Sequence, residues 1–202
     1  MASLIIGHGV TSIGQQAFSG CTSLTSLVIG NSVTSLGSSA FSGCSSITSM
    51  VVAEGNTKYD SREQCNAMID TATNTLILGC QNTIIPDSVT SIGSSAFGGC
   101  TSLESIVIPD SVTSIGGWAF EGCTSLESIV IPNSVTNIGR NAFYNCTQLN
   151  ITCYATIPPT LYNSSVLSSV KAVYVPAELV ETYKAATNWS YHSSKIQAIP
   201  ES

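Results

Sequence analysis

The hydrophobic and polar positions of this chain repeat with a period of 23 residues. The segment VTSIGSSAFGGCTSLESIVIPDS, residues 89–111, is followed at once by VTSIGGWAFEGCTSLESIVIPNS, residues 112–134. Further units begin at Val10, Val33 and Val135. Self-similarity at this spacing, with Leu and Ile at fixed positions, is typical of a solenoid in which each unit forms one turn of a coil.

Each unit carries the same ordered set of residues: a Val, a Leu or Ile, a Gly, an Ala, a Phe and a Cys. The Gly column favours a bend that needs positive φ or a close backbone approach. All five phenylalanines of the chain fall in the Phe column: Phe18, Phe41, Phe97, Phe120 and Phe143. Because only stacking buries five such rings at once, the pattern predicts a single aromatic spine inside the coil.

Three extended or turning segments are predicted in each unit. The run Leu103–Ile108 is β-branched and stops at Pro109, so we expect one parallel strand per turn on a concave wall, with Leu103, Ile106 and Ile108 pointing inward. The VTSIG segment predicts a second, short extended piece on the convex side. The AFxGC segment predicts a tight helical or 3₁₀ corner.

Two regions depart from the period. The step from Val33 to Val89 is 56 residues, one period plus 33, and places an insertion at about residues 53–81. Strands at 66–69 and 75–78 around a turn predict a hairpin on one edge of the coil.

The period fails again after Leu149, and the tail predicts a strand, a helix and a second strand, at residues 172–175, 176–186 and 196–199. A solenoid needs a terminal unit with a polar outer side. We therefore expect a solenoid at residues 1–158 and a C-terminal cap at 159–202, with Trp189 and Tyr191 packed beneath the cap.

Composition narrows the classes of function. Charged residues are 9% of the chain, and six Lys and Arg against twelve Asp and Glu give a formal charge of −6. Nucleic acid is excluded as a partner, because duplex binding needs clustered Lys and Arg. No run of 18 apolar residues predicts a transmembrane helix. Since residues 3–7 match 26–30, the chain begins inside a unit, and we expect the natural protein to be longer at this end, with an export signal upstream.

The motif IPxSVTxIGxxAFxGCxSLxSIxIP spans Ile85 to Pro132, the insertion reads NxxYDSRxxCNAMIxTxxNTL, and the tail reads VYVPAELVETYKAATNW. Together these resemble the BspA-type leucine-rich repeats of surface proteins from host-associated anaerobic bacteria and some parasitic protists. The resemblance implies an α/β leucine-rich-repeat solenoid, right-handed and β-rich, with a parallel concave sheet, a hairpin insertion and a C-terminal α/β cap. It also implies export to the cell surface and adhesion to host matrix proteins or other cells, and it brings no catalytic or cofactor-binding residues.

The eight cysteines are expected to be buried free thiols. In-register stacking would place neighbouring sulfurs about 5 Å apart with parallel Cβ vectors, whereas a disulfide needs about 2 Å. A bridge between Cys65 and Cys80 stays open, because a hairpin can bring them together. No CxxC pair supports a zinc site.

No residues suggest catalysis. His8 and His192 lack neighbours that would complete a triad or a metal cluster. The sequence allows Asp60 and Glu63 to act as an acid and a base, but Lys58 and Arg62 beside them favour a solvated loop. The sequence therefore predicts no enzyme, no cofactor and no metal, and a hydrolase is the least favoured class.

The strand wall is the best candidate for binding. Small polar, acidic and aliphatic residues alternate there, and an exposed aliphatic ladder suits an extended ligand, although β-branched residues also simply favour strands. The insertion hairpin and Trp118 are weaker alternatives. The predicted ligand-binding residues are Thr25, Val28, Thr48, Val51, Glu104, Val107, Glu127 and Val130. We expect a non-enzymatic interaction and adhesion module for a host or cell-surface protein; a glycan-binding region or a structural spacer is the alternative.

Overall fold

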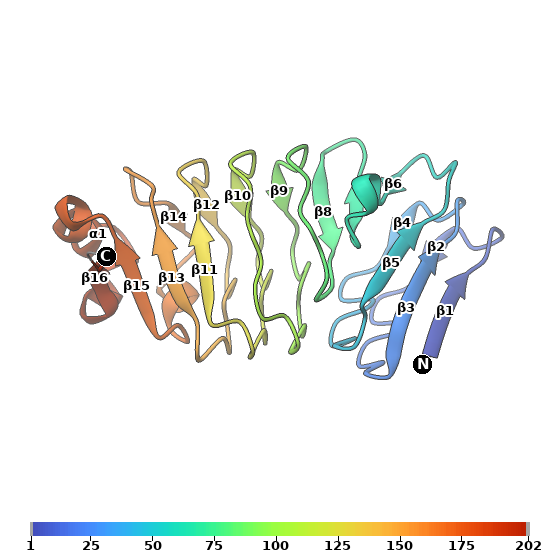
Figure 1. Cartoon of the computed structure of the whole chain (residues 1–202), viewed down its shortest axis with the longest axis horizontal. Helices are drawn as coiled ribbons and strands as arrows, with labels where there is room; N and C mark the ends of the chain where they lie inside the picture. Colours follow the sequence, from blue (N-terminus) through green and yellow to red (C-terminus); the bar gives the residue numbers. More distant parts are fainter. Residues whose placement is uncertain (1, 201–202) are drawn as a thin grey trace.

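The protein is an elongated coil with its two ends at opposite ends of a rod, seen in a computed structural model that describes residues 2–200 (Figure 1). Successive units lie side by side along the rod in sequence order. Each unit contributes one extended segment to a broad face, which we call the strand face, and a two-residue strand to a second face.

Two parallel sheets lie on the strand face. The N-terminal sheet contains β1 (Ala2–Ile6), β3 (Leu24–Ile29) and β5 (Ser49–Val52). The C-terminal sheet contains β11 (Ser128–Ile131), β13 (Asn150–Cys153), β15 (Ala172–Val175) and β16 (Ile196–Ala198).

The second face carries the VTSIG segments. Here β2 (Ser12–Ile13) pairs with β4 (Ser35–Leu36), and a seven-stranded sheet follows in the order β14-β12-β10-β9-β8-β7-β6. Its strands are β6 (Tyr59–Asp60), β7 (Met68–Asp70), β8 (Thr75–Leu78), β9 (Ser91–Ile92), β10 (Ser114–Ile115), β12 (Asn137–Ile138) and β14 (Thr160–Leu161).

Equivalent positions of neighbouring units stack in register. Ser114 lies between Ser91 and Asn137, and Leu27 lies beside Met50, each one period away along the chain. Buried aliphatic side chains alternate with half-buried or exposed ones along each strand, so the inward side chains of both faces form the core. The predicted leucine-rich-repeat architecture with parallel sheets is confirmed.

The corner segments differ from their predicted form. They are turns rather than helices. The Gly column does not adopt positive φ; its role is close approach, since a Cβ on Gly116 would lie 2.7 Å from the backbone of Gly93 and Ser94. Positive φ occurs two residues later, at Gln16, Ser39, Ser95, Trp118 and Asn141.

The aromatic column forms two stacks, so the prediction of a single spine is wrong. Phe18 stacks on Phe41 with ring centroids 5.2 Å apart, while Phe97, Phe120 and Phe143 stack at 5.1 and 5.8 Å. The buried apolar residues likewise divide into two clusters. The division falls at the insertion.

The insertion is a unit that lacks its AFxGC corner. Its strands β7 and β8 pair antiparallel across residues 71–74, and β6 pairs with β7 as a third strand that the sequence did not indicate. Gly79 follows β8 and packs on the Phe97 ring, where any side chain would overlap three ring atoms. With that corner missing, Gly43 donates its N–H directly to the Gly98 carbonyl of the next complete unit, at 3.0 Å.

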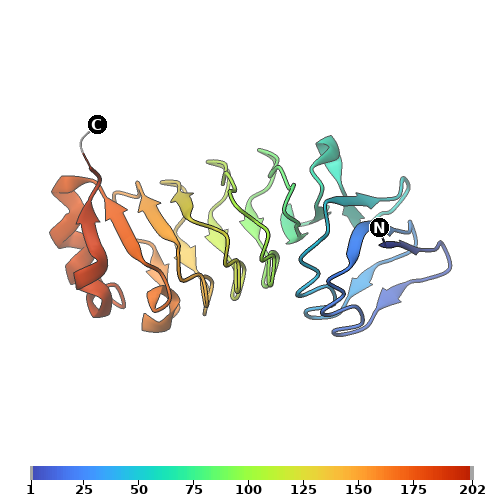
Figure 2. The same ribbon diagram turned by 60° about the horizontal axis from the view of Figure 1, so that its bottom comes forward.

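The C-terminal segment extends the strand face and covers its end. A 3₁₀ turn (Ala177–Leu179) leads into α1 (Val180–Ala185), and further 3₁₀ turns lie at Ser164–Leu167 and Ser190–Lys195. These helices gather at the C-terminal end of the rod (Figure 2).

Two aromatic residues of this segment were predicted to be buried. Trp189 is indeed buried, packs edge-on against Tyr183 and donates its indole N–H to the Pro159 carbonyl at 2.8 Å. Tyr191, in contrast, is 75% exposed, so its predicted burial is wrong. Tyr191 lies in the 3₁₀ turn Ser190–Lys195, which is irregular because the backbone of His192 departs from helical φ/ψ. None of the residues of this turn is buried.

Candidate functional site

The predicted binding residues are distributed over three separate stretches of the strand face. Thr25 and Val28 lie on β3 and pair with the β5 unit, where Val28 faces Val51 directly. Val130 lies on β11 and pairs with Thr152 of β13 instead. Glu104, Val107 and Glu127 lie outside any strand. The structure therefore does not bring the eight residues together on one continuous sheet.

The two threonines have a structural role. The Thr25 hydroxyl donates to the Ala2 carbonyl at 3.1 Å, and the Thr48 hydroxyl donates to the Thr25 carbonyl at 3.2 Å. Each bond links neighbouring turns of the coil. Because those hydroxyls are already bonded, the predicted ligand contacts that keep free side chains are those of the valine and glutamate columns.

The valine column is an exposed aliphatic ladder. Val51 is 47% exposed, Val130 48% and Val107 82%. Two further members were missed in the sequence: Ile5, which pairs with Val28 and is 70% exposed, and Ile84, which is 73% exposed. Ile84 could have been found from its place two residues before Pro86, which matches Val107 before Pro109.

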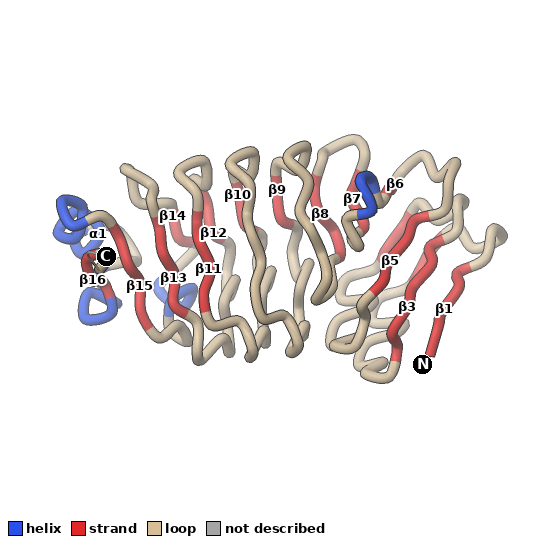
Figure 3. Tube along the Cα trace, viewed as in Figure 1, coloured by secondary structure: helices blue, strands red, loops and turns tan. Residues whose placement is uncertain are grey.

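The strand predicted at Leu103–Ile108 does not form. Figure 3 shows this stretch as loop between the strands β5 and β11 of the same face. Among residues 2–200, the backbone N–H groups of Glu104 to Ile108 donate no hydrogen bond, and β11 pairs only with β13. The strand face is therefore interrupted between its N-terminal and C-terminal sheets.

A proline column coincides with the interruption, although a proline at this position does not by itself prevent pairing, since Pro176 directly follows β15 and β15 still pairs with β13. In the paired units, the residue just after the strand donates across to the preceding turn: Ala53 N–H to the Ile29 carbonyl at 2.8 Å, and Tyr154 N–H to the Ile131 carbonyl at 3.3 Å. Pro109 and Pro132 occupy that position in the units that are not paired to the turn before. Proline has no N–H to donate and is confined to sheet edges for that reason.

The edge of β5 is covered by the insertion. Val52 donates its N–H to the Ser61 hydroxyl at 3.0 Å, and Met50 donates to the Asn66 side-chain carbonyl at 3.4 Å. On the other side of this segment, Ile84 donates to the Cys65 carbonyl at 3.0 Å. Residues 61–66 thus occupy the place of a strand, and the open region begins beyond residue 85.

The open region is a groove of about 700 Å³ between two extended segments. Thr83, Ile84 and Ile85 line one side, and residues 105–108 line the other. Asp87 and Asp110 lie at one end, and no Lys or Arg lines the groove.

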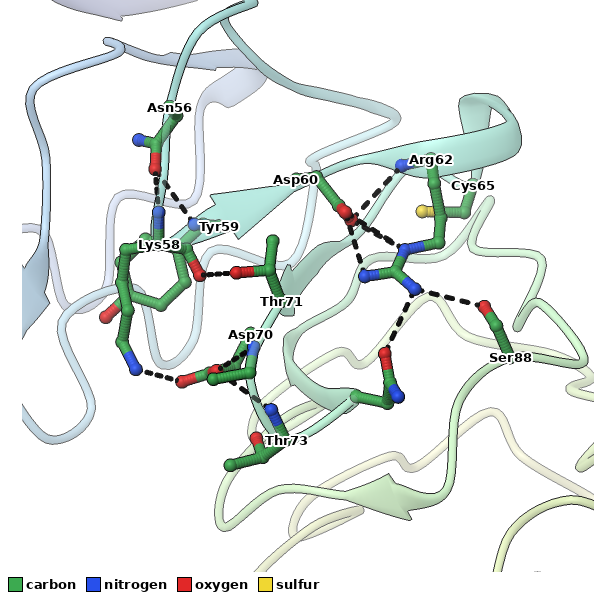
Figure 4. A network of polar contacts seen from close by, with 12 residues as sticks. Asn56, Lys58, Tyr59, Asp60, Arg62, Cys65, Asp70, Thr71, Thr73 and Ser88 are labelled. Atoms are coloured by element: carbon green, nitrogen blue, oxygen red, sulfur yellow. Dashed lines mark hydrogen bonds and ion pairs between the residues drawn. The ribbon is translucent and has the colours of Figure 1, made fainter.

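A polar network stabilises the insertion (Figure 4). Asp70, a buried carboxylate, accepts the backbone N–H of Ala72 at 3.0 Å and of Thr73 at 3.2 Å, and pairs with the Lys58 ammonium at 2.5 Å. Burial opposes ionisation of Asp70, but the lysine and the two N–H groups outweigh it, so its pKa lies below the ordinary value.

A second ion pair lies beside it. The Arg62 guanidinium binds Asp60 at 2.8 Å and also donates to the Asn74 side chain at 3.0 Å. Asp60 is therefore held by a cation rather than poised as an acid or base with Glu63. The network links the loop before β7 to the turn after it.

We predict that Asp70→Ala lowers the free energy of unfolding by about 1–2 kcal/mol at pH 7, because two backbone donors and a lysine lose their acceptor. The folded-state pKa of Asp70 is depressed, so its contribution is complete above about pH 4 and declines as the pH falls through the folded value. Urea unfolding at pH 7 and pH 3 should therefore show a smaller difference between variant and wild type at pH 3. Asp87→Ala, an exposed carboxylate, should change stability by less than about 0.5 kcal/mol at either pH; an equal effect of the two substitutions would contradict the role of the network.

All eight cysteines are free, and seven are buried. Cys65 and Cys80 are therefore not bridged. The stacked thiols donate to the preceding turn: Cys146 to the Phe120 carbonyl at 2.9 Å and Cys123 to the Phe97 carbonyl at 3.3 Å. Burial raises the pKa of Cys146 to about 11 and that of Cys100 to about 12, so these thiols stay protonated at neutral pH.

We predict that a thiol reagent of Ellman type titrates one cysteine in the folded chain and eight in guanidinium. The fast thiol should be Cys21, the exposed one, because the thiolate is the reactive form and the others are buried. Cys21→Ser should remove the fast phase. A folded chain that titrates three or more thiols at the fast rate would contradict the stacked column.

The remaining candidate residues, two histidines and Trp118, interact with neighbouring residues of the chain. His8 bonds the Asn31 side chain at 2.8 Å, His192 bonds the Ser164 carbonyl at 2.5 Å, and Trp118 lies under the Arg140 guanidinium at 5.5 Å. Across residues 2–200, no three His, Cys, Asp or Glu side chains are grouped to hold a metal. Within the same range, no helix has the length and apolar character needed to cross a membrane.

A coil of 23-residue turns with parallel strands, Leu and Ile side chains inward and an exposed strand face defines a leucine-rich-repeat protein. The chain belongs to the BspA type leucine rich repeat region family, whose model matches six copies over residues 1–73 and 76–186. No curated protein sequence matches the chain.

Two solved structures share this fold. A leucine-rich repeat protein from Eubacterium ventriosum is 21% identical over 87% of this chain and 60% of its own, with a TM-score of 0.63. The pneumococcal vaccine antigen PcpA is 18% identical over 97% of this chain and 66% of its own, with a TM-score of 0.54. This chain therefore spans less than two thirds of the length of either protein.

Proposed function

We propose that this chain is a non-enzymatic protein-interaction and adhesion module of a cell-surface or extracellular protein, and that the strand face is its docking surface. The observation that carries the proposal is the exposure of the aliphatic side chains Val51, Val107 and Val130 on this face. A row of exposed apolar side chains is unfavourable in water for an isolated domain, and it provides a contact surface for a binding partner.

Charge supports a protein partner of complementary sign. Glu104 and Glu127 are exposed beside the ladder and form no ion pair within residues 2–200. Acidic side chains at the rim of an interface steer association and set specificity more than they add affinity. A host or cell-surface protein that presents a basic, partly apolar surface fits this face.

The family and its known structures support the surface setting. One protein with the same fold, PcpA, is a pneumococcal vaccine antigen. We infer by analogy that this chain is also exported, that residues 1–158 coil in a right-handed sense as the binding unit, and that residues 159–202 cap them. A glycan-binding region or a structural spacer is the alternative function.

The test is capture of immobilised extracellular-matrix proteins by the chain. We predict that the double charge reversal Glu104→Lys and Glu127→Lys changes capture at least fivefold at low salt. The control is Glu121→Lys with Glu178→Lys, which makes the same change in net charge away from the strand face. Equal effects of the two double variants would remove the strand face as the docking surface, and no capture of any matrix or cell-surface protein would favour the spacer.

A further inference from the structure

We propose that the groove between residues 82–85 and 103–108 binds an extended peptide that carries basic residues, and that this peptide pairs main chain to main chain with residues 104–108. The partner would supply the strand that is missing from the strand face. This inference rests on the proposed function and names the chemistry of its ligand.

Unpaired main chain is the first support. The N–H groups of Glu104 to Ile108 donate to no protein group within the described residues, although they lie in an extended segment. Side chains of a partner cannot satisfy such a row at the regular two-residue spacing of a strand, whereas another extended main chain can. A sheet edge of this kind is a template for strand addition.

The register of the paired units shows which edge is open. Ala53 donates its N–H to the preceding turn of the coil. The direction of the N–H groups alternates from residue to residue along a strand, so the N–H of Val51, two residues earlier, lies on the same edge. Val107 is the equivalent of Val51 in its unit. The Val107 N–H is therefore directed toward the segment 82–85 and into the groove.

The groove also uncovers apolar surface. The inward side chains beside it are slightly exposed, at 7% for Ile85, 8% for Ile106 and 6% for Ile108. Among the equivalents in paired units, Leu27, Ile29 and Ile131 are 0% exposed, Ile129 is 2% and Val52 is 7% exposed. Together with the outward Ile84 and Val107, they offer contacts to alternate apolar side chains of a strand.

Charge selects the kind of peptide. Asp87 and Asp110 line one end of the groove, Glu104 follows Leu103 at the start of the unpaired segment, and the whole chain has a formal charge of −6. A peptide with Lys or Arg flanking its apolar residues is favoured by this arrangement. A second copy of this acidic chain is disfavoured for the same reason.

The experiment selects binders from a displayed library of random octapeptides on the intact chain. We expect enriched sequences that alternate apolar and polar residues and carry at least one Lys or Arg. Hydrogen–deuterium exchange of the chain with a synthetic enriched peptide should slow the amides of Ser105 and Val107, whose N–H groups lie on the groove edge, at least tenfold. Fluorescence anisotropy of the same peptide measures its affinity.

Two variants at one position separate main-chain pairing from side-chain contact. Val107→Pro removes the N–H that faces the groove and should weaken binding at least tenfold. Val107→Ala keeps the N–H and should weaken binding less than about threefold. Because Val107 is 82% exposed and donates no hydrogen bond, both variants should keep the wild-type circular dichroism and melting temperature, which is checked first.

Each outcome decides the question. Absence of enrichment, equal affinity for Val107→Pro and wild type, or protection of amides elsewhere would overturn strand addition. A free chain that dimerises by light scattering with protection of 104–108 would assign the groove to a second copy, and a glycan-array signal lost in Val107→Pro without peptide enrichment would assign it to a sugar. If matrix capture responds to Glu104 and Glu127 while the groove binds no peptide, the docking surface stands and the groove proposal alone fails.

Discussion

Replacing Phe120 with alanine should lower the free energy of unfolding by about 3–5 kcal/mol, as expected for a fully buried phenylalanine. The Phe120 ring is 0% exposed and stacks on Phe97 at 5.1 Å and on Phe143 at 5.8 Å. Its loss leaves a cavity that neither neighbour can fill, because each is fixed by its own turn of the coil. Urea unfolding followed by circular dichroism measures the change.

Phe18→Ala is the matched control. Phe18 occupies the same column, but it is only half-buried and stacks on Phe41 alone. Its replacement should cost less than half as much as that of Phe120. If the two substitutions were equally costly, depth within the stack would not govern stability, and the description of the coil as units that pack only on their neighbours would fail.

Gly79→Val should be the most damaging substitution at the insertion, with an expected loss of about 3 kcal/mol or more from overpacking. A Cβ at this position would overlap the Phe97 ring, which is itself buried and fixed by its stack. The backbone cannot withdraw easily, because the Gly79 N–H donates to the Ala96 carbonyl at 2.8 Å. Thermal unfolding of the variant measures the loss.

Gly14→Val provides the comparison. A Cβ at Gly14 meets no atom within 4 Å, and its φ is ordinary. This variant should keep stability within about 1 kcal/mol of the wild type. A tolerated Gly79→Val would show that the Phe97 ring is not held against Gly79 tightly enough to exclude a side chain.

Periodicity predicted the repeating elements well, because a solenoid converts one sequence period into one structural turn. The inward columns of Leu and Ile, the short VTSIG strands and the hairpin segment Thr75–Leu78 all lie where the pattern placed them. The arrangement of one turn follows from residues within that turn, so a single sequence carries it.

Two of the errors concern how one unit meets the next. The Phe column divides because the insertion lacks a corner, so Phe41 and Phe97 have no ring between them. The strand at 103–108 is absent because strand pairing needs a partner segment within reach, and the N–H groups of residues 104–108 donate to no neighbouring segment within residues 2–200. Val107 is a residue type that favours strands, but this propensity does not reveal whether a neighbouring segment lies close enough to pair.

The candidate site was located only in part. The outward valines and the acidic column were identified from their positions between inward residues; Val51, Val107, Val130 and the two glutamates are exposed, whereas Val28 is half-buried. The groove was not foreseen, since it arises from the shortened unit around Ile84 and the proline column together. In the sequence, Pro86, Pro109 and Pro132 were interpreted only as the ends of strands. That Pro109 and Pro132 follow segments not paired to the turn before becomes visible once the register is known.

Amide hydrogen exchange on the free chain tests the central claim most directly, namely that the strand face is interrupted at residues 103–108. The account predicts that the amides of Ser105 to Ile108 exchange at least a hundredfold faster than those of Ile151 to Cys153, which lie in the paired strand β13. Protection of Ser105 to Ile108 equal to that of β13 would show a continuous sheet, and would contradict both the groove and the binding mode inferred from it.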